Sequence, residues 1–171
     1  MPLDLGRAFA QRKYESVNLA ALAVAKTILP DVINPCPQGF DLAMVSSHLI
    51  GKAVGWSLPW KSEFEYLASD PRKIGCAIVV DDQLCGLALG RINKKGTSLS
   101  FSLLEGNPDP LHPFKGHVLD TIEVFGLSCC NAIGATELRF VNPLEGALEH
   151  YLESGFALVE GPPTYCVKVL K

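Results

Sequence analysis

The sequence predicts an α/β (α+β) fold: a mixed, mostly antiparallel central sheet flanked by helices, with an N-terminal helical extension. From Ile74 onward, strand and helix patterns follow one another in the order β-β-β-α-β-α-β-β. The helical pattern at 114–132 is long enough to connect two parallel strands. A meander followed by such a crossover produces a mixed sheet with helices on its faces. We expect one domain, 1–171, with the extension at 1–35 and the core at 40–171.

The first element is a long helix, expected over residues 4–29 and closed by Pro30. Proline removes a backbone donor and its ring clashes with the preceding turn, so helices tend to end before it. The proline-rich segment 34–39 must then be extended or turning. The helix has a broad apolar face at helical spacing, which consists of Val17, Ala21, Leu22, Val24, Ala25, Ile28 and Leu29.

Two interpretations fit residues 40–55. They form either a strand at 40–45 followed by a short helix at 47–54, or one continuous helix. The next segment, 56–60, is expected to be a loop that carries both tryptophans of the chain. One or two helical turns follow at 62–68.

The clearest pattern is an antiparallel meander of three strands joined by polar turns. Gly86 and Gly90 in its second strand suggest bulges or close packing. Three prolines in the segment 107–113 exclude regular structure before the crossover helix, and Gly134 is expected to end that helix. Strands are expected at 74–80, 84–92, 97–104, 137–141, 156–160 and 164–170, with a last helix at 144–154.

Composition indicates a packed globular protein and excludes some function classes. Apolar residues make up 48% of the chain, more than a disordered chain contains. The net charge is −3 and no block of five or six like charges occurs, so the basic surface of a nucleic-acid binder is missing. No segment approaches the ~20 apolar residues of a membrane span. We therefore expect neither a nucleic-acid nor a membrane partner.

The six cysteines follow no C-x-x-C spacing, and most of them lie in apolar runs. A free cysteine in such a run packs like a small hydrophobic side chain. A chain of this length needs no disulfide framework, so we expect reduced thiols in a cytoplasmic protein. No cysteine–histidine pair has the spacing of zinc ligands, and no metal site is predicted.

The most informative motif is Tyr-Leu-Glu-Ser-Gly-Phe at 151–156. Tyr151 lies near the end of a helix, and Gly155 occupies the position where a helix C-cap requires a positive φ. Phe156 then opens an apolar run typical of a buried strand. Together with the order of elements, this corner resembles the last helix-to-strand corner of the GNAT superfamily of acyl-CoA N-acyltransferases. The resemblance covers roughly residues 40–171.

The resemblance implies an acetyl-CoA site along the third strand of the meander and at the start of the crossover helix. Family members usually carry a G-x-G or G-x-A step there, whose small residues let backbone N–H groups approach the pyrophosphate. The equivalent stretch here is 112–119, in which only Gly116 is small. The residues expected to contact the cofactor are Leu103, Leu104, Lys115, Gly116, His117 and Val118.

The resemblance also implies two catalytic residues. Tyr151 would donate a proton to the departing CoA thiolate; the alternative is a ring packed at a helix end with a solvated hydroxyl. Glu105 would take the proton of the attacking amine, or else be a solvated carboxylate at a strand end. His112 and His117 are alternative bases or phosphate contacts, because imidazole titrates near neutral pH. His150 is expected at the surface.

Two functions fit this sequence. The first is an acetyl-CoA-dependent N-acetyltransferase in which a small-molecule or peptide amine attacks the thioester directly. Acetyl-CoA would lie between strands 97–104 and 137–141, with backbone N–H groups of the former polarising its carbonyl. The second is a catalytically inactive GNAT-fold module for binding or assembly. Its N-terminal helix would then pair two subunits into a homodimer.

Overall fold

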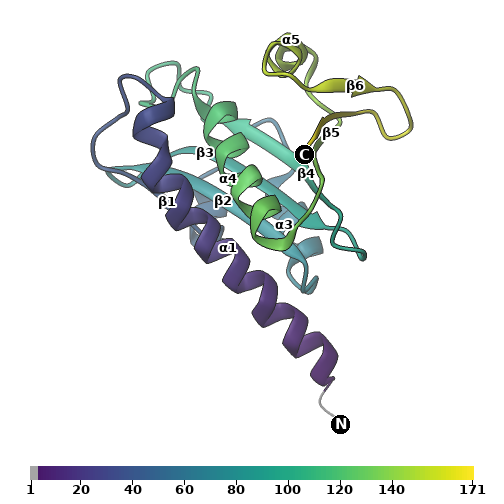
Figure 1. Cartoon of the computed structure of the whole chain (residues 1–171). Helices are drawn as coiled ribbons and strands as arrows, with labels where there is room; N and C mark the ends of the chain where they lie inside the picture. The colour runs from purple at the N-terminus through teal and green to yellow at the C-terminus, as the bar shows by residue number, and fades with distance from the viewer. Residues whose placement is uncertain (1–3) are drawn as a thin grey trace.

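The computed structural model describes residues 4–171, and all of its strands join one sheet (Figure 1). The strands are β1 (Phe40–Ala43), β2 (Lys73–Val80), β3 (Gln83–Ile92), β4 (Ser98–Gly106), β5 (Glu137–Val141), β6 (Ala157–Val159) and β7 (Tyr165–Val169). Their order in the sheet is β1-β2-β3-β4-β5-β7-β6. Within the described chain only β4 and β5 pair in parallel, which confirms the predicted mixed, mostly antiparallel sheet. The first three residues of the predicted extension, 1–35, lie outside the described part.

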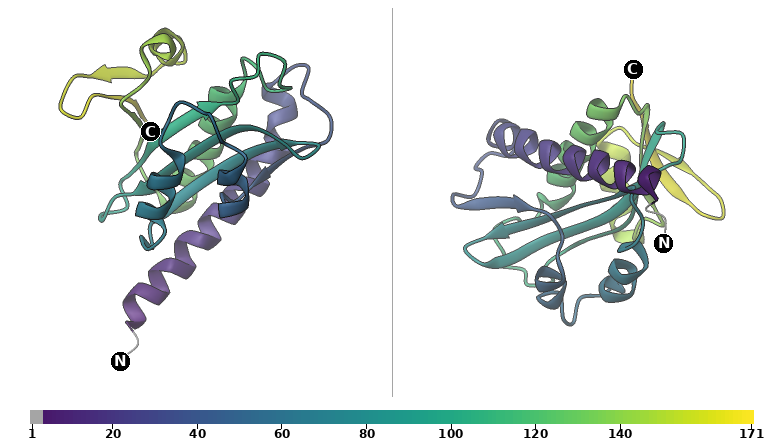
Figure 2. Two further views of the ribbon diagram at one scale, coloured as in Figure 1. Left: turned by 180° about the vertical axis from the view of Figure 1, so that it is seen from behind. Right: turned by 90° about the horizontal axis from the view of Figure 1, so that it is seen from below.

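Helices cover both faces of this sheet (Figure 1 and Figure 2). They are α1 (Leu5–Val32), α2 (Ser47–Gly51), α3 (Trp60–Leu67), α4 (Val118–Ile133) and α5 (Leu148–Glu153). Helices α1 and α4 lie side by side on one face, whereas α2 and α3 lie on the other. Each face therefore has its own buried apolar cluster. None of the helices in residues 4–171 combines the length and apolar character needed to cross a membrane.

Helix α1 continues to Val32 with Pro30 inside its last turn, so the predicted end at Leu29 is wrong. The N–H of Ile33 still donates to the carbonyl of Leu29 at 2.9 Å. Both of these side chains are fully buried, and burying an aliphatic side chain stabilises the fold by about 1.5–3 kcal/mol. Packing of this turn therefore offsets the ~3 kcal/mol that a proline costs inside a helix.

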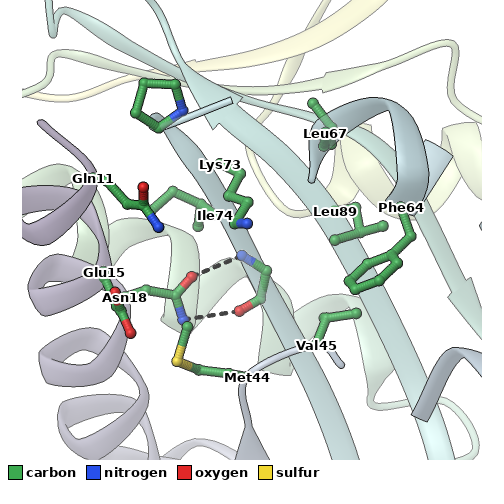
Figure 3. A pocket seen from close by; sticks show the side chains of 12 residues that line it. Gln11, Glu15, Asn18, Met44, Val45, Phe64, Leu67, Lys73, Ile74 and Leu89 are labelled. Atoms are coloured by element: carbon green, nitrogen blue, oxygen red, sulfur yellow. Dashed lines mark hydrogen bonds between the residues drawn. The ribbon is translucent and has the colours of Figure 1, made fainter. Parts of the chain in front are cut away.

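A single buried amide, that of Asn18, fastens α1 to the sheet (Figure 3). Its Nδ2 donates to the carbonyl of Gly75 at 3.0 Å, and its Oδ1 accepts from the N–H of the same residue at 2.8 Å. Strand β1 pairs with β2 only along Ala77–Val80, so Gly75 has no strand partner on that side. The Asn18 amide takes the place of the missing strand.

The first of the two interpretations of residues 40–55 is confirmed, because β1 is followed by the short helix α2. Helix α3 begins at Trp60 rather than at residue 62, so the predicted loop at 56–60 is one residue too long. The Trp60 side chain is buried in the cluster on this face of the sheet. Its packing accounts for the earlier start of the helix.

The crossover helix α4 begins at Val118, so its predicted start at Phe114 is wrong. Phe114 is fully buried in the preceding turn and meets the ring of Phe40 edge-on, with centroids 5.8 Å apart. Gly116 has a φ of +82°, which an α-helix does not accommodate. At the other end the prediction is confirmed, because Gly134 caps α4 with a φ of 73°.

The corner at 151–156 has the backbone geometry expected from its sequence, but the prediction of a buried strand after it is wrong, because Ala157 and Leu158 of β6 are exposed. Gly155 has a φ of +89°, and the N–H of Phe156 donates to the carbonyl of Tyr151 at 3.1 Å. Both ring side chains are buried. The corner thus turns the chain from α5 into β6 and leaves Tyr151 inside the molecule.

Replacing Asn18 with alanine should lower the free energy of unfolding by about 2–4 kcal/mol, because two buried backbone groups of Gly75 lose their partner. Urea denaturation followed by circular dichroism measures the change. Thr27→Ala is the matched control on the same helix, since its hydroxyl bonds the exposed carbonyl of Ala23; we expect a change within about 0.5 kcal/mol. An Asn18→Ala variant as stable as the unmodified protein would contradict this account.

Candidate active site

Strands β4 and β5 diverge in the middle of the sheet. They pair only along Ser98–Phe101 and Glu137–Phe140, although β4 continues to Gly106 beside β3. Beyond the last pair, no strand of residues 4–171 is hydrogen-bonded to this side of β4. A cleft of about 680 Å³ opens at that point, between the two strands and the start of α4.

A bulge in β4 lies where the strands separate. Gly90 of β3 stands opposite Phe101, but the preceding residue, Leu89, stands opposite Leu103, so Ser102 is an extra residue. A Cβ atom on Gly90 would lie 2.1 Å from a backbone oxygen of β4, which excludes every other residue type at that position. This confirms the close packing predicted there. A bulge bends its strand and ends regular pairing, which is what opens the cleft.

The structure brings most of the predicted site residues together. Seven of the eight line the cleft: Leu103, Leu104, Glu105, Lys115, Gly116, Val118 and Tyr151. The eighth, His117, is the N-cap residue of α4. Its Nδ1 lies 4.0 Å from the carboxylate of Asp120, and its side chain does not line the cleft.

Tyr151 lines the cleft with an otherwise buried ring. The ring centroid lies 5.1 Å from that of Phe140 and 5.8 Å from that of Phe156, and only 3% of the residue is exposed. Burial, and secondarily the nearby Cys166 thiol, raises the pKa of Tyr151 above its ordinary value. The phenol therefore stays protonated, and none of the side-chain hydrogen bonds within residues 4–171 involves its hydroxyl. Tyr151 thus contributes a hydrogen-bond donor to the lining of the cleft.

Glu105 is held by three donors from the segment that carries the tryptophans. Its Oε1 accepts from the N–H of Ser57 at 2.7 Å. Its Oε2 accepts from the N–H of Leu58 at 3.1 Å and from the indole Nε1–H of Trp60 at 2.8 Å. A carboxylate offers about four acceptor positions, so one remains on Oε1. The carboxylate therefore fixes this segment as a wall of the cleft and keeps one free acceptor position.

The start of α4 combines features suited to an anion. The backbone N–H groups of the first turn have no partners within a helix, and the helix dipole places positive potential there. Lys115 and Gly116 line the cleft just before this turn. No side chain caps the helix. A negatively charged group in the cleft would therefore meet free N–H donors and a lysine cation.

His112 is buried beside this turn, contrary to the usual exposure of a loop histidine. Only 3% of the residue is exposed. Its Nδ1 is inaccessible to solvent and has no hydrogen-bond partner in residues 4–171. Burial lowers the pKa of His112, the cation of Lys115 lowers it further, and Asp109 partly opposes both. The imidazole is therefore neutral near pH 7, and His112 is one of the residues that line the cleft.

Two residues of the cleft were missed by sequence reasoning. His150 lies at the surface as expected, with 43% of its side chain exposed, but it also lines the cleft, with its Nε2 3.5 Å from the carboxylate of Asp120. Asn142 also lines the cleft and has a φ of +49°, a conformation that asparagine adopts more readily than most residues. Its N–H donates to the carbonyl of Thr164 at 2.7 Å. A polar residue directly after β5 was the signal that could have indicated it.

The cysteines offer no activated nucleophile. All six are free, and all but Cys36 are buried. Burial raises the pKa of each thiol, that of Cys130 to about 11, so almost none is ionised near neutral pH. Residues 4–171 also contain no group of three or more histidine, cysteine or acidic side chains arranged to hold a metal ion.

No protein-family model matches this sequence, and no curated protein sequence is significantly similar to it. Solved structures nevertheless share its architecture. Ard1 from Thermoplasma volcanium superposes with a TM-score of 0.59 at 12% identity, over 78% of this chain and 99% of that chain. An acetyltransferase from Thermus thermophilus superposes with a TM-score of 0.56 at 20% identity, over 77% and 97%. The N-acetyltransferase PseH from Campylobacter jejuni, solved with acetyl coenzyme A, superposes with a TM-score of 0.57 at 15% identity. The superposition covers 77% of this chain and 99% of that chain.

These likenesses show that the chain has the fold of the GNAT acyltransferases, as its sequence predicts. At such low identities the likeness establishes the fold alone. The function of such a fold resides in the residues of its site, which here are those that line the cleft.

Glu105→Gln should loosen the tryptophan segment, because an amide nitrogen cannot accept the hydrogen bonds that the carboxylate accepts. We expect the free energy of unfolding to fall by about 2 kcal/mol and the tryptophan emission to shift to longer wavelength, since Trp56 and Trp60 are the only tryptophans. The matched control is Glu65→Gln on an exposed part of α3. Unchanged emission and stability in Glu105→Gln would show that the three contacts do not hold the segment.

His112 should make the protein less stable as the pH falls. Because the folded-state pKa of His112 lies below the ordinary value of 6.5, the unfolded chain takes up a proton first. Stability is therefore lost as the pH falls below 6.5 towards the folded-state pKa, by at most about 1.4 kcal/mol per pH unit. His112→Gln should remove this part of the pH dependence in urea denaturation at about pH 7.5 and about pH 5.5, whereas exposed His48→Gln should not. Identical pH dependence in both variants would contradict the prediction.

Proposed function

We propose that this protein is an acetyl-CoA-dependent N-acetyltransferase that acts on an amine of a small molecule or peptide. The observation that carries the proposal is the cleft at the divergence of β4 and β5. A buried tyrosine with a free hydroxyl lines it, and the N-terminus of α4 lies at its edge. The fold shared with solved acetyltransferases supports the same conclusion.

The lining of the cleft fits acetyl-CoA. Past the bulge, the backbone groups of β4 at Leu103 and Leu104 have no strand partner on the β5 side, and a bound pantetheine amide would pair with them. The pyrophosphate would meet Lys115, Gly116 and Val118, next to the free N–H groups that follow the N-cap residue His117. Acetyl-CoA supplies an activated thioester, whose carbon–sulfur bond breaks as the amine nitrogen bonds to its carbonyl carbon.

Tyr151 and Glu105 would assist this transfer in different ways. Tyr151 would donate a hydrogen bond, and ultimately the proton, to the sulfur that leaves. The pKa of Tyr151 is raised, so stabilisation of the thiolate by the intact O–H would precede any complete transfer. Glu105 would accept the proton of the amine through a water molecule at the free position on its Oε1. N–H groups of β4 would stabilise the negative charge on the carbonyl oxygen.

A second candidate function is a non-catalytic GNAT-fold module that assembles through α1. Leu5 and Phe9 near the start of this helix are 74% and 75% exposed, which is unusual for large apolar side chains. These side chains would be covered if two copies paired as a homodimer. In that case the cleft would have no need to bind acetyl-CoA.

Titration calorimetry with acetyl-CoA and with CoA tests the proposed function. We expect both to bind with micromolar dissociation constants, and acetyl-CoA with a panel of amines to release the free thiol of CoA. Tyr151→Phe should bind CoA within about twofold of the unmodified protein but lose roughly 100-fold in turnover. Tyr14→Phe, another buried tyrosine but outside the cleft, is the control. No heat of binding at millimolar CoA would contradict the proposal and favour the second candidate.

A further inference from the structure

A second cavity lies on the opposite side of the diverging strands, under helix α3. It has a volume of about 390 Å³ and is bounded by α3 and by β3, β4 and β5. Ser102 and Val141 line both this cavity and the cleft described above, so the two meet where β4 and β5 separate. We call the second cavity the α3 groove. Its charged lining residues are Glu63, Arg91 and Arg139.

Three polar side chains form a row across the floor of the α3 groove. Ser100 of β4 stands opposite Arg91 of β3 and also opposite Arg139 of β5. Residues that stand opposite each other on neighbouring strands point to the same face, with about 4.8 Å between strands. All three line the groove. Two guanidinium groups therefore flank one hydroxyl on the same face of the sheet.

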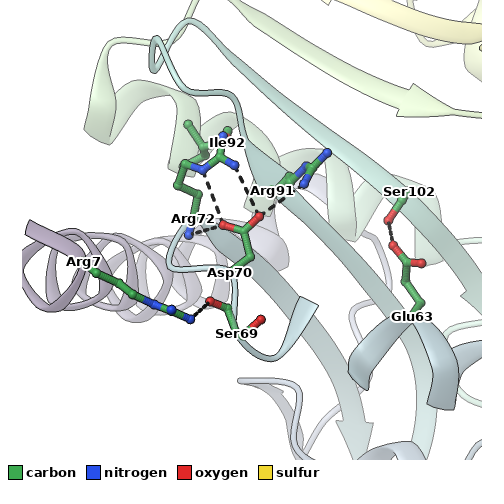
Figure 4. A network of polar contacts seen from close by, with 8 residues as sticks. All are labelled: Arg7, Glu63, Ser69, Asp70, Arg72, Arg91, Ile92 and Ser102. Carbon is green, nitrogen blue, oxygen red and sulfur yellow. Dashed lines mark hydrogen bonds and ion pairs between the residues drawn. The ribbon is translucent and has the colours of Figure 1, made fainter. Parts of the chain in front are cut away.

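Both guanidinium groups are anchored but keep free donors. Arg91 donates from Nη1 to Asp70 at 3.3 Å (Figure 4). Arg139 donates from Nε and Nη2 to Glu137, and its guanidinium lies 4.8 Å from the centre of the Tyr165 ring. A guanidinium carries five N–H donors, so most of those on Arg91 and several on Arg139 remain. Asp70 and Glu137 position the two arginines for a further anion.

The carboxylate of Glu63 marks the other end of the groove. Its Oε1 accepts the hydroxyl of Ser102 at 2.8 Å (Figure 4), and its second oxygen has no partner among residues 4–171. Ser102 lies at the junction with the cleft and two residues from Ser100, roughly 6–7 Å along the strand. The groove thus has a carboxylate, Glu63, that can bind a cation at the junction. Further along β4 it has two guanidinium groups, Arg91 and Arg139, that can bind an anion.

From this arrangement we infer that the α3 groove binds the acyl acceptor, and that the acceptor is an amine that also carries a carboxylate or similar anion. Its ammonium group pairs with Glu63 at the junction, and its anionic group lies against Arg91 and Arg139. Charge-assisted hydrogen bonds at both ends give the acceptor one orientation, with the amine next to the cleft. The inference rests on the proposed function only in naming the bound amine an acyl acceptor.

Three probes of similar size test the inference: γ-aminobutyrate, its amide γ-aminobutyramide, and butyrate. Binding to the protein without acetyl-CoA is measured by titration calorimetry or by ligand-observed NMR. We expect γ-aminobutyrate to bind about tenfold more tightly than either of the others, because each lacks one charged contact. With acetyl-CoA present, the acid should also be acetylated with a lower KM than the amide.

Variants assign the two ends of the groove. Arg91→Met and Arg139→Met should each weaken γ-aminobutyrate by about fivefold or more while leaving the amide unchanged, and Arg139→Lys should be less affected. Glu63→Gln, which keeps an acceptor for the Ser102 hydroxyl, should weaken both amines but not butyrate. Arg72→Gln is the matched control, because Arg72 shares Asp70 with Arg91 but does not line the groove. Circular dichroism checks that each variant is folded.

Several outcomes would overturn the inference: equal binding of the acid and the amide, equal weakening of both by the arginine variants, or no binding of any probe at millimolar concentration. Because binding is measured without acetyl-CoA, the result is independent of the proposed function. If the protein binds γ-aminobutyrate in preference to the amide but does not bind CoA, the anion site in the α3 groove is supported and the proposed transferase function is refuted. If it binds CoA but does not prefer the acid, the transferase function is supported and the inference about the groove is refuted.

Discussion

The extra residue in β4 is the constraint on which the rest of this structure depends. Because β4 carries Ser102 where β3 has no counterpart, the strand bends after Phe101 and cannot remain hydrogen-bonded to β5. The bulge in turn requires Gly90 opposite it, where no Cβ fits. A central sheet normally satisfies its own backbone groups. Here it leaves a row of N–H and C=O groups that face a cavity, and such groups favour a ligand with amides of its own.

The bulge also changes which way the side chains of β4 point. Phe101 and Leu104 belong to the cluster under α1 and α4. Between them, Ser102 bonds Glu63 of α3 and Leu103 packs on the same face as α3. Two consecutive residues therefore share one face, which an unbroken strand does not allow. As a result, Ser102 lines both the cleft and the α3 groove, so the two cavities adjoin at this residue.

Features that follow from local rules could be predicted from the sequence, and features that depend on distant contacts could not. The order of elements and the corner at 151–156 rest on periodicity and on a glycine with positive φ. The predicted start of α4 at Phe114 was wrong because this residue lies outside the helix and packs against Phe40. The roles of the site residues also depend on contacts between residues that are far apart in the sequence. Glu105 could be placed at a strand end, but its bond to Trp60 joins residues 45 positions apart.

The contact between Asn18 and Gly75 has a consequence for the behaviour of the chain in solution. An open stretch of strand edge is a template on which another chain can pair, and proteins commonly protect such edges with a helix. Strand β2 has an open stretch before Ala77, where β1 has already ended. Helix α1 covers it and offers a side-chain amide in place of a strand. The N-terminal helix therefore removes this stretch of β2 as a template for another chain, in addition to contributing to the core.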